Sequence, residues 1–320
     1  MKPVIFGLAG ETLGPDERAF FAEVEPAGYI LFKRNIVDRG QLRALTDALR
    51  SLHGRDDLLI MIDQEGGRVA RMQAPVWPSF PPAALFDRLY DIAPSSAIAA
   101  ARANAQAIAL TLAEVGITVD ALPLLDVRQD GASDIMGDRT LGAEPMRVAA
   151  LGRAMLEGLA AGGVVGIVKH MPGHGRALVD SHLDLPVVTA NADALERDLA
   201  PFRTLRSAPM GMTAHVVYTQ WDADRPATLS PTVPPMPPCL RKSSSSSRTF
   251  GTFAKGTRRV IARRYASPTS TNWAISWGWS TPSTTTTIRV TAPAPPAIYW
   301  RSCPPRRNQR ISRSHRDMQP

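Results

Sequence analysis

Short apolar runs alternate with helical patterns over the first 217 residues, and this alternation restricts the fold more than any other feature of the sequence. Runs with the length and β-branched content of buried strands occur at Val4–Ala9, Gly28–Phe32, Leu58–Ile62, Ile117–Leu125, Gly163–Val168 and Gly211–Val217. Between them, the spacing of apolar residues predicts helices at Asp16–Glu25, Gln41–Leu52, Ser96–Val115, Pro145–Ala161 and Asp193–Arg206. This order predicts parallel βαβ units and an α/β fold.

Polar clusters follow the predicted strands three to six. They are Asp63–Arg71, Gly137–Thr140, Lys169–His182 and His215. In a (β/α)₈ barrel, side chains at the carboxyl ends of all strands converge on one site, whereas a doubly wound sheet concentrates them at one switch point. Clusters after four successive strands therefore favour a TIM-type (β/α)₈ barrel.

The segment Lys169–His182 contains three histidines, a lysine and an aspartate, and its prolines and glycines predict a loop. Asp180 and His182 are two residues apart, so in an extended segment they point the same way. A carboxylate can fix the tautomer of a neighbouring imidazole and keep its pKa near working pH, which suits a general acid/base pair. The structural alternative is a loop histidine that simply hydrogen-bonds a neighbouring carboxylate.

The histidines of this segment also allow the interpretation that His170, His174 and His182 bind a metal ion. It is disfavoured because Pro172 and Gly173 break the helix that would align two ligands one turn apart, and we predict no metal and no cofactor. His174 is interpreted first as a loop-shaping residue. His215 either lines a pocket or is a buried strand-end histidine, and both remain candidates for the site.

Three of these motifs carry a family resemblance. Asp63–Arg71 resembles an Asp-Gln-Glu-Gly-Gly-Arg segment, Gly137–Thr140 a Gly-Asp-Arg segment, and Lys169–His182 a Lys-His-Phe-Pro-Gly-His-Gly to Asp-Ser-His signature, with Met171 in place of Phe. Residues 1–233 thus resemble the cytosolic β-N-acetylglucosaminidases of glycoside hydrolase family 3. The resemblance implies a TIM-type barrel, no metal, and removal of terminal N-acetylglucosamine, notably from muropeptides in peptidoglycan recycling.

The resemblance also implies roles for particular residues. His182 is the catalytic acid/base with Asp180 as its partner, a variant of the usual two-carboxylate arrangement. The implied sugar-binding residues share charge-assisted hydrogen bonding to hydroxyl or acetamido groups: Asp63, Arg71, Arg139, Lys169 and His170. The structural alternatives to sugar binding are an ordinary ion pair between Asp63 and Arg71, and an Arg139 side chain that is simply solvated. We expect a muropeptide-type glycoside as ligand, a cytoplasmic monomer, no secretory signal, and no membrane or nucleic-acid partner.

The last 87 residues differ sharply in composition. Of the 37 Lys and Arg in the chain, 15 lie in Pro234–Pro320, together with a single acidic residue, Asp317. The first 233 residues are therefore mildly acidic. Because the excess positive charge lies in the last 87 residues, the net charge of +8 is no evidence that the first 233 residues bind an anionic partner. The tail has low-complexity runs of proline, serine and threonine, and only Thr284–Val290 is predicted as a strand. We predict a barrel at 1–233 and a disordered or out-of-frame tail at 234–320.

A catalytic carboxylate is missing from this tail. A retaining double displacement needs a nucleophilic carboxylate, which the family carries as an aspartate after strand seven, beyond the segment seen here as Ala227–Pro231. Residues 234–316 contain no Asp or Glu. We expect strands seven and eight to be missing or replaced, the barrel edges to be open, and the chain to be inactive. The alternatives are a sugar-binding pseudoenzyme and a tail that binds nucleic acid or an anionic surface.

One hypothesis for the tail is that the family reading frame was left near Val233. The other two frames of the coding DNA would then contain an aspartate-bearing strand-seven motif.

Overall fold

A computed structural model describes residues 1–131, 136–179 and 184–233, and further along the chain the backbone of four short strands. The helices are α1 (Pro15–Val24), η1 (Lys33–Asn35), α2 (Arg39–His53), α3 (Ala83–Ile92), α4 (Pro94–Glu114), η2 (Gly137–Arg139), α5 (Pro145–Ala161) and α6 (Ala192–Thr204). The strands are β1 (Lys2–Gly7), β2 (Pro26–Ile30), β3 (Leu59–Ile62), β4 (Gln64–Gly66), β5 (Val69–Ala70), β6 (Val119–Asp120), β7 (Val165–Met171), β8 (Val187–Val188), β9 (Met210–Thr213), β10 (Val217–Tyr218), β11 (Asp222–Pro226), β12 (Arg259–Val260), β13 (Ala262–Arg264), β14 (Trp273–Gly278) and β15 (Thr287–Arg289).

The main sheet confirms the predicted α/β barrel topology. Strands β1, β2, β3, β6, β7 and β9 pair as parallel neighbours in that order. Strand β14 pairs parallel with β9, and β15 pairs antiparallel with both β14 and β1. The ring of strands is therefore of TIM type, with strands seven and eight replaced by β14 and an antiparallel β15.

Two expectations for the tail are corrected by these pairings. The prediction of open barrel edges is wrong, because β9 and β1 both have partners. The prediction of one strand in the tail is also wrong: β15 falls inside the predicted Thr284–Val290, but β12, β13 and β14 were not predicted. Proline, serine and threonine richness argued against these strands, and in the structure tertiary pairing prevails over that local preference.

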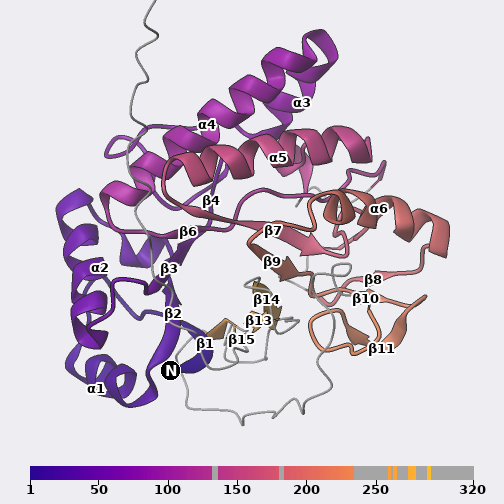
Figure 1. Ribbon diagram of the computed structural model, residues 1–320. Coiled ribbons are helices and arrows are strands. Elements are labelled where there is room, and N and C mark those ends of the chain that lie inside the picture. Colours follow the sequence, from indigo (N-terminus) through magenta and orange to yellow (C-terminus); the bar gives the residue numbers. More distant parts are fainter. Residues whose placement is uncertain are drawn as a thin grey trace, which may run out of the picture.

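The helices cover the outside of the strand layer. In Figure 1, α1 and α2 lie at the left, α3, α4 and α5 across the top, and α6 at the right of the strands. Helix α2 shows why: its buried residues Leu42, Leu45, Thr46 and Leu49 form one stripe at i, i+3, i+4 and i+7. The helix begins where the Asp38 carboxylate accepts a hydrogen bond from the Gln41 amide, a standard N-cap.

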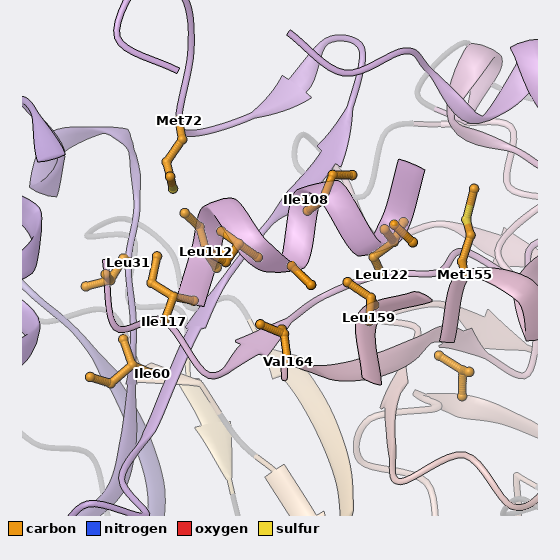
Figure 2. Close-up of a cluster of buried hydrophobic side chains, with 14 of the residues drawn as sticks. Leu31, Ile60, Met72, Ile108, Leu112, Ile117, Leu122, Met155, Leu159 and Val164 are labelled. Carbon is orange, nitrogen blue, oxygen red and sulfur yellow. The ribbon is translucent and has the colours of Figure 1, made fainter. Parts of the chain in front are cut away.

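Two hydrophobic layers follow from this arrangement. The interior of the barrel is filled by residues of alternate strand positions, among them Ile5, Met61, Val119, Ile167 and Met210. The larger layer lies between the strands and the helices (Figure 2), where Ile108 and Leu112 of α4 lie near residues that adjoin β6 and β7. Both faces of the parallel strands are thus buried, as expected for this fold.

Small residues allow α4 and α5 to approach closely. A Cβ on Gly158 would lie 2.2 Å from the Arg102 carbonyl oxygen, and a Cβ on Gly162 would lie 2.4 Å from the Ala109 Cβ. The alanine-rich sequence of α4 presents Ala105 and Ala109 at this contact. The helical prediction for Pro145–Ala161 matches α5 residue for residue.

Several element boundaries differ from the predictions, and one helix was missed. Strand β7 runs on to Met171, so Lys169 and His170 belong to a strand and not to the predicted loop. The predicted fourth strand is reduced to β6 plus a bridge at Leu124, because Pro123 lacks an amide donor. Helix α3 was not predicted, since the prolines before it were interpreted as a crossing segment.

A buried hydrogen bond joins β2 to the end of α2. The Tyr29 hydroxyl lies 2.6 Å from His53 Nε2, and Tyr29 has no exposed surface. Burial raises the pKa of Tyr29, so its hydroxyl keeps its proton and donates to the ring. Burial, helped by the charge of Arg55, lowers the pKa of His53 below 6.5, so the folded state prefers the neutral imidazole.

We expect Tyr29→Phe to cost about 1 kcal/mol of stability, the usual net value of a hydrogen bond. Because the pKa of His53 is lower in the folded state, its contribution is complete above pH 6.5 and is lost as the pH falls. The loss of stability between pH 7.5 and 5.5 should be smaller in Tyr29→Phe than in the parent chain, as measured by urea unfolding. Tyr90→Phe, at a half-buried tyrosine whose ring faces Arg147, is the control. Identical pH dependence in the Tyr29 variant and the parent would contradict this role.

Across the described ranges, none of the helices combines the length and the apolar character that a membrane span requires.

Candidate active site

Charged side chains from several segments meet at the carboxyl ends of β3 and β7. Asp63 directly follows β3, and Glu65 lies in β4, which forms a hairpin with β5. Lys169 and His170 come from β7, and Arg139 comes from η2 in the long connection before α5. Parallel strands bring their carboxyl ends to one edge, which is where the sequence placed the site.

Lys169 is the centre of this group. Its ammonium nitrogen lies 3.2 Å from Asp63 Oδ1 and 2.6 Å from Glu65 Oε1, and only 2% of its side chain is exposed. A buried ammonium needs such partners, because removing an unpaired charge from water costs several kcal/mol. Lys169 therefore fixes both carboxylates at once.

Two arginines complete the ion-pair group. Arg139 donates from Nε to Glu65 Oε2 and from a terminal nitrogen to Glu65 Oε1, both at 2.8 Å, which is the bidentate geometry of the strongest ion pairs. Arg71 donates to Asp63 Oδ2 at 3.2 Å. Only 11% of the Arg139 side chain is exposed, so the alternative of a solvated loop charge is wrong. We call Asp63, Glu65, Arg71, Arg139 and Lys169 the ionic cluster.

The cluster keeps its carboxylates ionised. Burial alone would raise the pKa of Glu65, but Lys169 and Arg139 outweigh it and hold the pKa at about 2. Lys169 and Arg71 likewise hold the pKa of Asp63 below its ordinary value against the effect of burial. Three cations face two carboxylates, so the cluster carries a net positive charge at neutral pH.

His170 is oriented by a carboxylate that sequence reasoning missed. Asp126 has no exposed surface; its Oδ2 lies 2.8 Å from His170 Nδ1, and its Oδ1 accepts the amide hydrogens of His170 at 3.1 Å and His174 at 2.7 Å. Burial opposes ionisation of Asp126, but these contacts hold its pKa at about 2. An ionised carboxylate can only accept, so His170 Nδ1 carries the proton and Nε2 is left as an acceptor.

His174 and His215 differ in their surroundings. His174 is buried, its pKa is lowered to about 4 mainly by burial, and its Nδ1 has no hydrogen-bond partner among the described residues. Its amide bond to Asp126 agrees with a loop-shaping role. His215 Nδ1 lies 2.8 Å from the Thr228 hydroxyl, on the side of the small β8–β10–β11 sheet.

The structure brings together all five residues of the implied sugar-binding set, namely Asp63, Arg71, Arg139, Lys169 and His170. Glu65 and Asp126 were missed. Glu65 stands in the same polar motif as Asp63, and Asp126 follows the apolar run at the end of the fourth predicted strand, so position at a strand end was the available signal. Asp180 and His182 lie outside the described residues, and their roles stay predictions.

Over the residues that the structure describes, no group of three or more His, Cys, Asp or Glu could hold a metal ion. His182, one of the three histidines considered as metal ligands, is not among them.

Residues 13–243 match the Glycosyl hydrolase family 3 N terminal domain. A beta-hexosaminidase from Alkalilimnicola ehrlichii is 39% identical over 233 residues, which are 72% of this chain and 66% of that protein. Among solved structures, native NagZ from Neisseria gonorrhoeae has a TM-score of 0.67 at 36% identity, over 72% of this chain and 67% of that one. NagZ from the same organism in complex with N-trifluoroacetyl-D-glucosamine has a TM-score of 0.68 at 36% identity, over 72% and 68% of the two chains.

The chain thus spans just under two thirds of the length of its curated relatives. The match covers the strands and helices that build the ionic cluster. This protein belongs to glycoside hydrolase family 3.

Proposed function

We propose that residues 1–233 bind the terminal, non-reducing β-N-acetylglucosamine of a glycoside, and that the natural ligand is a muropeptide of peptidoglycan recycling in the cytoplasm. The observation that carries this proposal is the ionic cluster, which contains four of the five residues implied by the family resemblance. Arg71 and Lys169 pair with Asp63, and Arg139 joins them through Glu65. The relatives named beta-hexosaminidase and the NagZ complex with N-trifluoroacetyl-D-glucosamine support the choice of sugar.

Solvent exposure separates the residues of the ionic cluster and the adjacent His170 into those that can reach a ligand and those that hold them in place. Arg71, at 31% of its side chain, His170, at 17%, and Asp63 have accessible surface, so we propose that they contact sugar hydroxyls. Arg139 is aligned by Glu65, and we propose that its guanidinium group contacts a hydroxyl or the acetamido oxygen of the sugar. Lys169 acts on the ligand chiefly through Asp63, which it orients.

We propose that the family reaction is a retaining double displacement in which His182, oriented by Asp180, moves the proton. That reaction also needs a carboxylate nucleophile. Asp63, Glu65 and Asp126 are all engaged by buried cations or N–H donors, and residues 234–316 contain no Asp or Glu. We therefore propose that this chain binds the sugar as a monomer and does not turn it over.

The division of the chain into a family-like part at 1–233 and a part of different composition at 234–320, whose strands β14 and β15 complete the ring, belongs to the same proposal. The family match ends at residue 243, which supports a boundary in this region.

A calorimetric titration of the full chain with N-acetylglucosamine tests the binding proposal. We expect saturable binding in the parent chain and its loss in Arg139→Ala, because that change removes the bidentate partner of Glu65. Arg43→Ala, at an exposed helix position paired with Asp47, is the control and should bind normally. An aryl β-N-acetylglucosaminide should bind without release of the aryl alcohol.

The binding measurement and the turnover measurement test two different parts of the proposal. A parent chain that does not bind the sugar would refute the proposal that the ionic cluster is a sugar-binding site. Release of the aryl alcohol at an ordinary glycosidase rate would instead refute the argument that the nucleophile is missing.

A further inference from the structure

Asp120 is a buried carboxylic residue that the proposed function leaves unused. It is the last residue of β6, it has no exposed surface, and it pairs in register with Ile62, the residue before Asp63. Its neighbours Val119 and Ala121 belong to the barrel interior, so the side chain of Asp120 points to the opposite side of the strand. Asp120 thus lies behind the ionic cluster and does not reach a sugar.

The hydrogen bond that Asp120 makes replaces a missing strand contact. The Ala121 amide donates to the Ile62 carbonyl at 2.9 Å, which continues the pairing of this segment with β3. Two residues beyond the end of β3, at the start of β4, the amide of Gln64 donates instead to Asp120 Oδ1 at 3.0 Å. A side chain therefore holds the backbone at the residue between Asp63 and Glu65.

The side chain of Gln64 holds the backbone at Arg71 and Met72 by hydrogen bonds. Its side-chain oxygen accepts the amide hydrogens of Arg71 at 2.9 Å and Met72 at 3.0 Å, and its side-chain nitrogen donates to the Met72 carbonyl at 2.9 Å. Gln64 is therefore linked by sequence to both carboxylates of the ionic cluster and by hydrogen bonds to the segment that carries Arg71.

The charge around Asp120 favours its protonated form. Within the described part of the chain, no cation forms an ion pair with it, while the ionised Asp63 and Glu65 lie nearby and Lys169 is engaged by them. Burial, which is the largest effect, and these carboxylates raise the pKa of Asp120 well above its ordinary value, against the Gln64 amide and Lys169. A protonated carboxyl retains an oxygen that accepts from Gln64.

We propose that Asp120, as a protonated carboxylic acid, is a positioning residue that holds Gln64 and thereby keeps Asp63, Glu65 and Arg71 in sugar-binding geometry. This inference rests on the proposed function, because its consequence is measured as sugar affinity. Asparagine has the same shape and an acceptor oxygen but no ionisable proton, so it should keep the bond from the Gln64 amide. Its amide nitrogen takes the place of Oδ2, which has no hydrogen-bond partner among the described residues and where the protonated acid also carries a donor. Alanine cannot keep the bond from the Gln64 amide.

The test compares Asp120→Asn and Asp120→Ala with the parent chain in calorimetric titrations with N-acetylglucosamine. We expect the Asn variant to bind within about twofold of the parent, and the Ala variant to bind roughly tenfold more weakly, because the Gln64 amide loses its buried acceptor. Asp57→Asn and Asp57→Ala, at an exposed aspartate, are the matched controls and should both bind as the parent does. Asn binding as weakly as Ala would show that the ionised form is needed and would overturn the proposal, as would normal binding by Ala.

A second measurement does not depend on the sugar or on the stability of the Ala variant. Infrared spectra of the parent chain with isotope-labelled aspartate should contain the C=O stretch of a protonated carboxyl at pH 7. Most of this band should be lost in Asp120→Asn, and the remainder comes from Asp198, whose pKa is raised to about 6. Identical spectra would overturn the protonated state. A parent chain that shows the band but does not bind N-acetylglucosamine would refute the proposed function and leave the protonation intact.

Discussion

Lys169→Met is expected to lower the free energy of unfolding by roughly 3–5 kcal/mol and to abolish sugar binding. Breaking a buried ion pair costs this much because the partner charge stays buried without compensation, and here there are two such partners. Lys169 is 1% exposed and contacts both Asp63 and Glu65, whereas methionine supplies the same length without the charge. Urea unfolding at pH 7 measures the first effect and calorimetry the second.

The pH dependence of this variant separates lost charge from lost packing. In the parent chain the pKa values of Asp63 and Glu65 are lowered, so their stabilisation is present above about pH 4 and is lost as the pH falls toward 2. Without Lys169, burial is opposed by less positive charge, the carboxyl pKa values rise, and protonation relieves the buried charge. The stability difference between variant and parent should therefore shrink between pH 7 and pH 5.

Lys33→Met, at an exposed lysine of η1, is the matched control and should leave stability and binding unchanged. If the Lys169 and Lys33 variants unfolded at the same urea concentration, the ionic cluster would not be the structural centre described above.

Gly175→Ala is expected to cost about 1–3 kcal/mol and to weaken sugar binding by more than tenfold, because it forces a close contact in a packed site. A Cβ at this position would lie 1.9 Å from the Val127 carbonyl oxygen, closer than any real contact. Gly175 follows His174, and Val127 follows Asp126, so separating the two segments strains the bonds of Asp126 to His170 and His174. Thermal unfolding and N-acetylglucosamine titration measure the two effects.

The control for this change is Gly10→Ala, since a Cβ on Gly10 would meet nothing within 4 Å. Normal sugar affinity in the Gly175 variant would contradict a requirement for the close approach of these two segments.

Local sequence patterns predicted most of the elements because each pattern has a direct physical cause. The stripe of Leu42, Leu45 and Leu49 can be buried only by a helix, and Pro145 with Gly162 marks the two ends of α5. The motif positions were also sufficient to group Asp63, Arg139 and Lys169 at one edge of the sheet.

Other features depend on contacts that no local pattern encodes. The roles of Glu65 and Asp126 follow from which cation or ring each meets across the barrel, at separations of 74 and 44 residues from Arg139 and His170. The pairing of β14 with β9 and of β15 with β1 is likewise a nonlocal choice that residue composition argued against. Asp120 looked like an ordinary strand residue, and only its environment distinguishes it.

The course of the chain after β6 has a further consequence for the site. Beyond Ala121, the backbone hydrogen bonds of this segment in the described ranges go to β7, at Ile167 and Lys169, and β3 is no longer their partner. The sheet therefore separates between β3 and β6 at the level of Asp63, and a long side chain, Lys169, crosses the opening from β7. The proposed ligand site lies at a seam of the barrel that is joined through side chains, by the Lys169–Asp63 ion pair and by the bond from the Gln64 amide to Asp120. On this proposal, an entering sugar would exchange one set of side-chain contacts for another, and no hydrogen bond between two backbone groups would have to break.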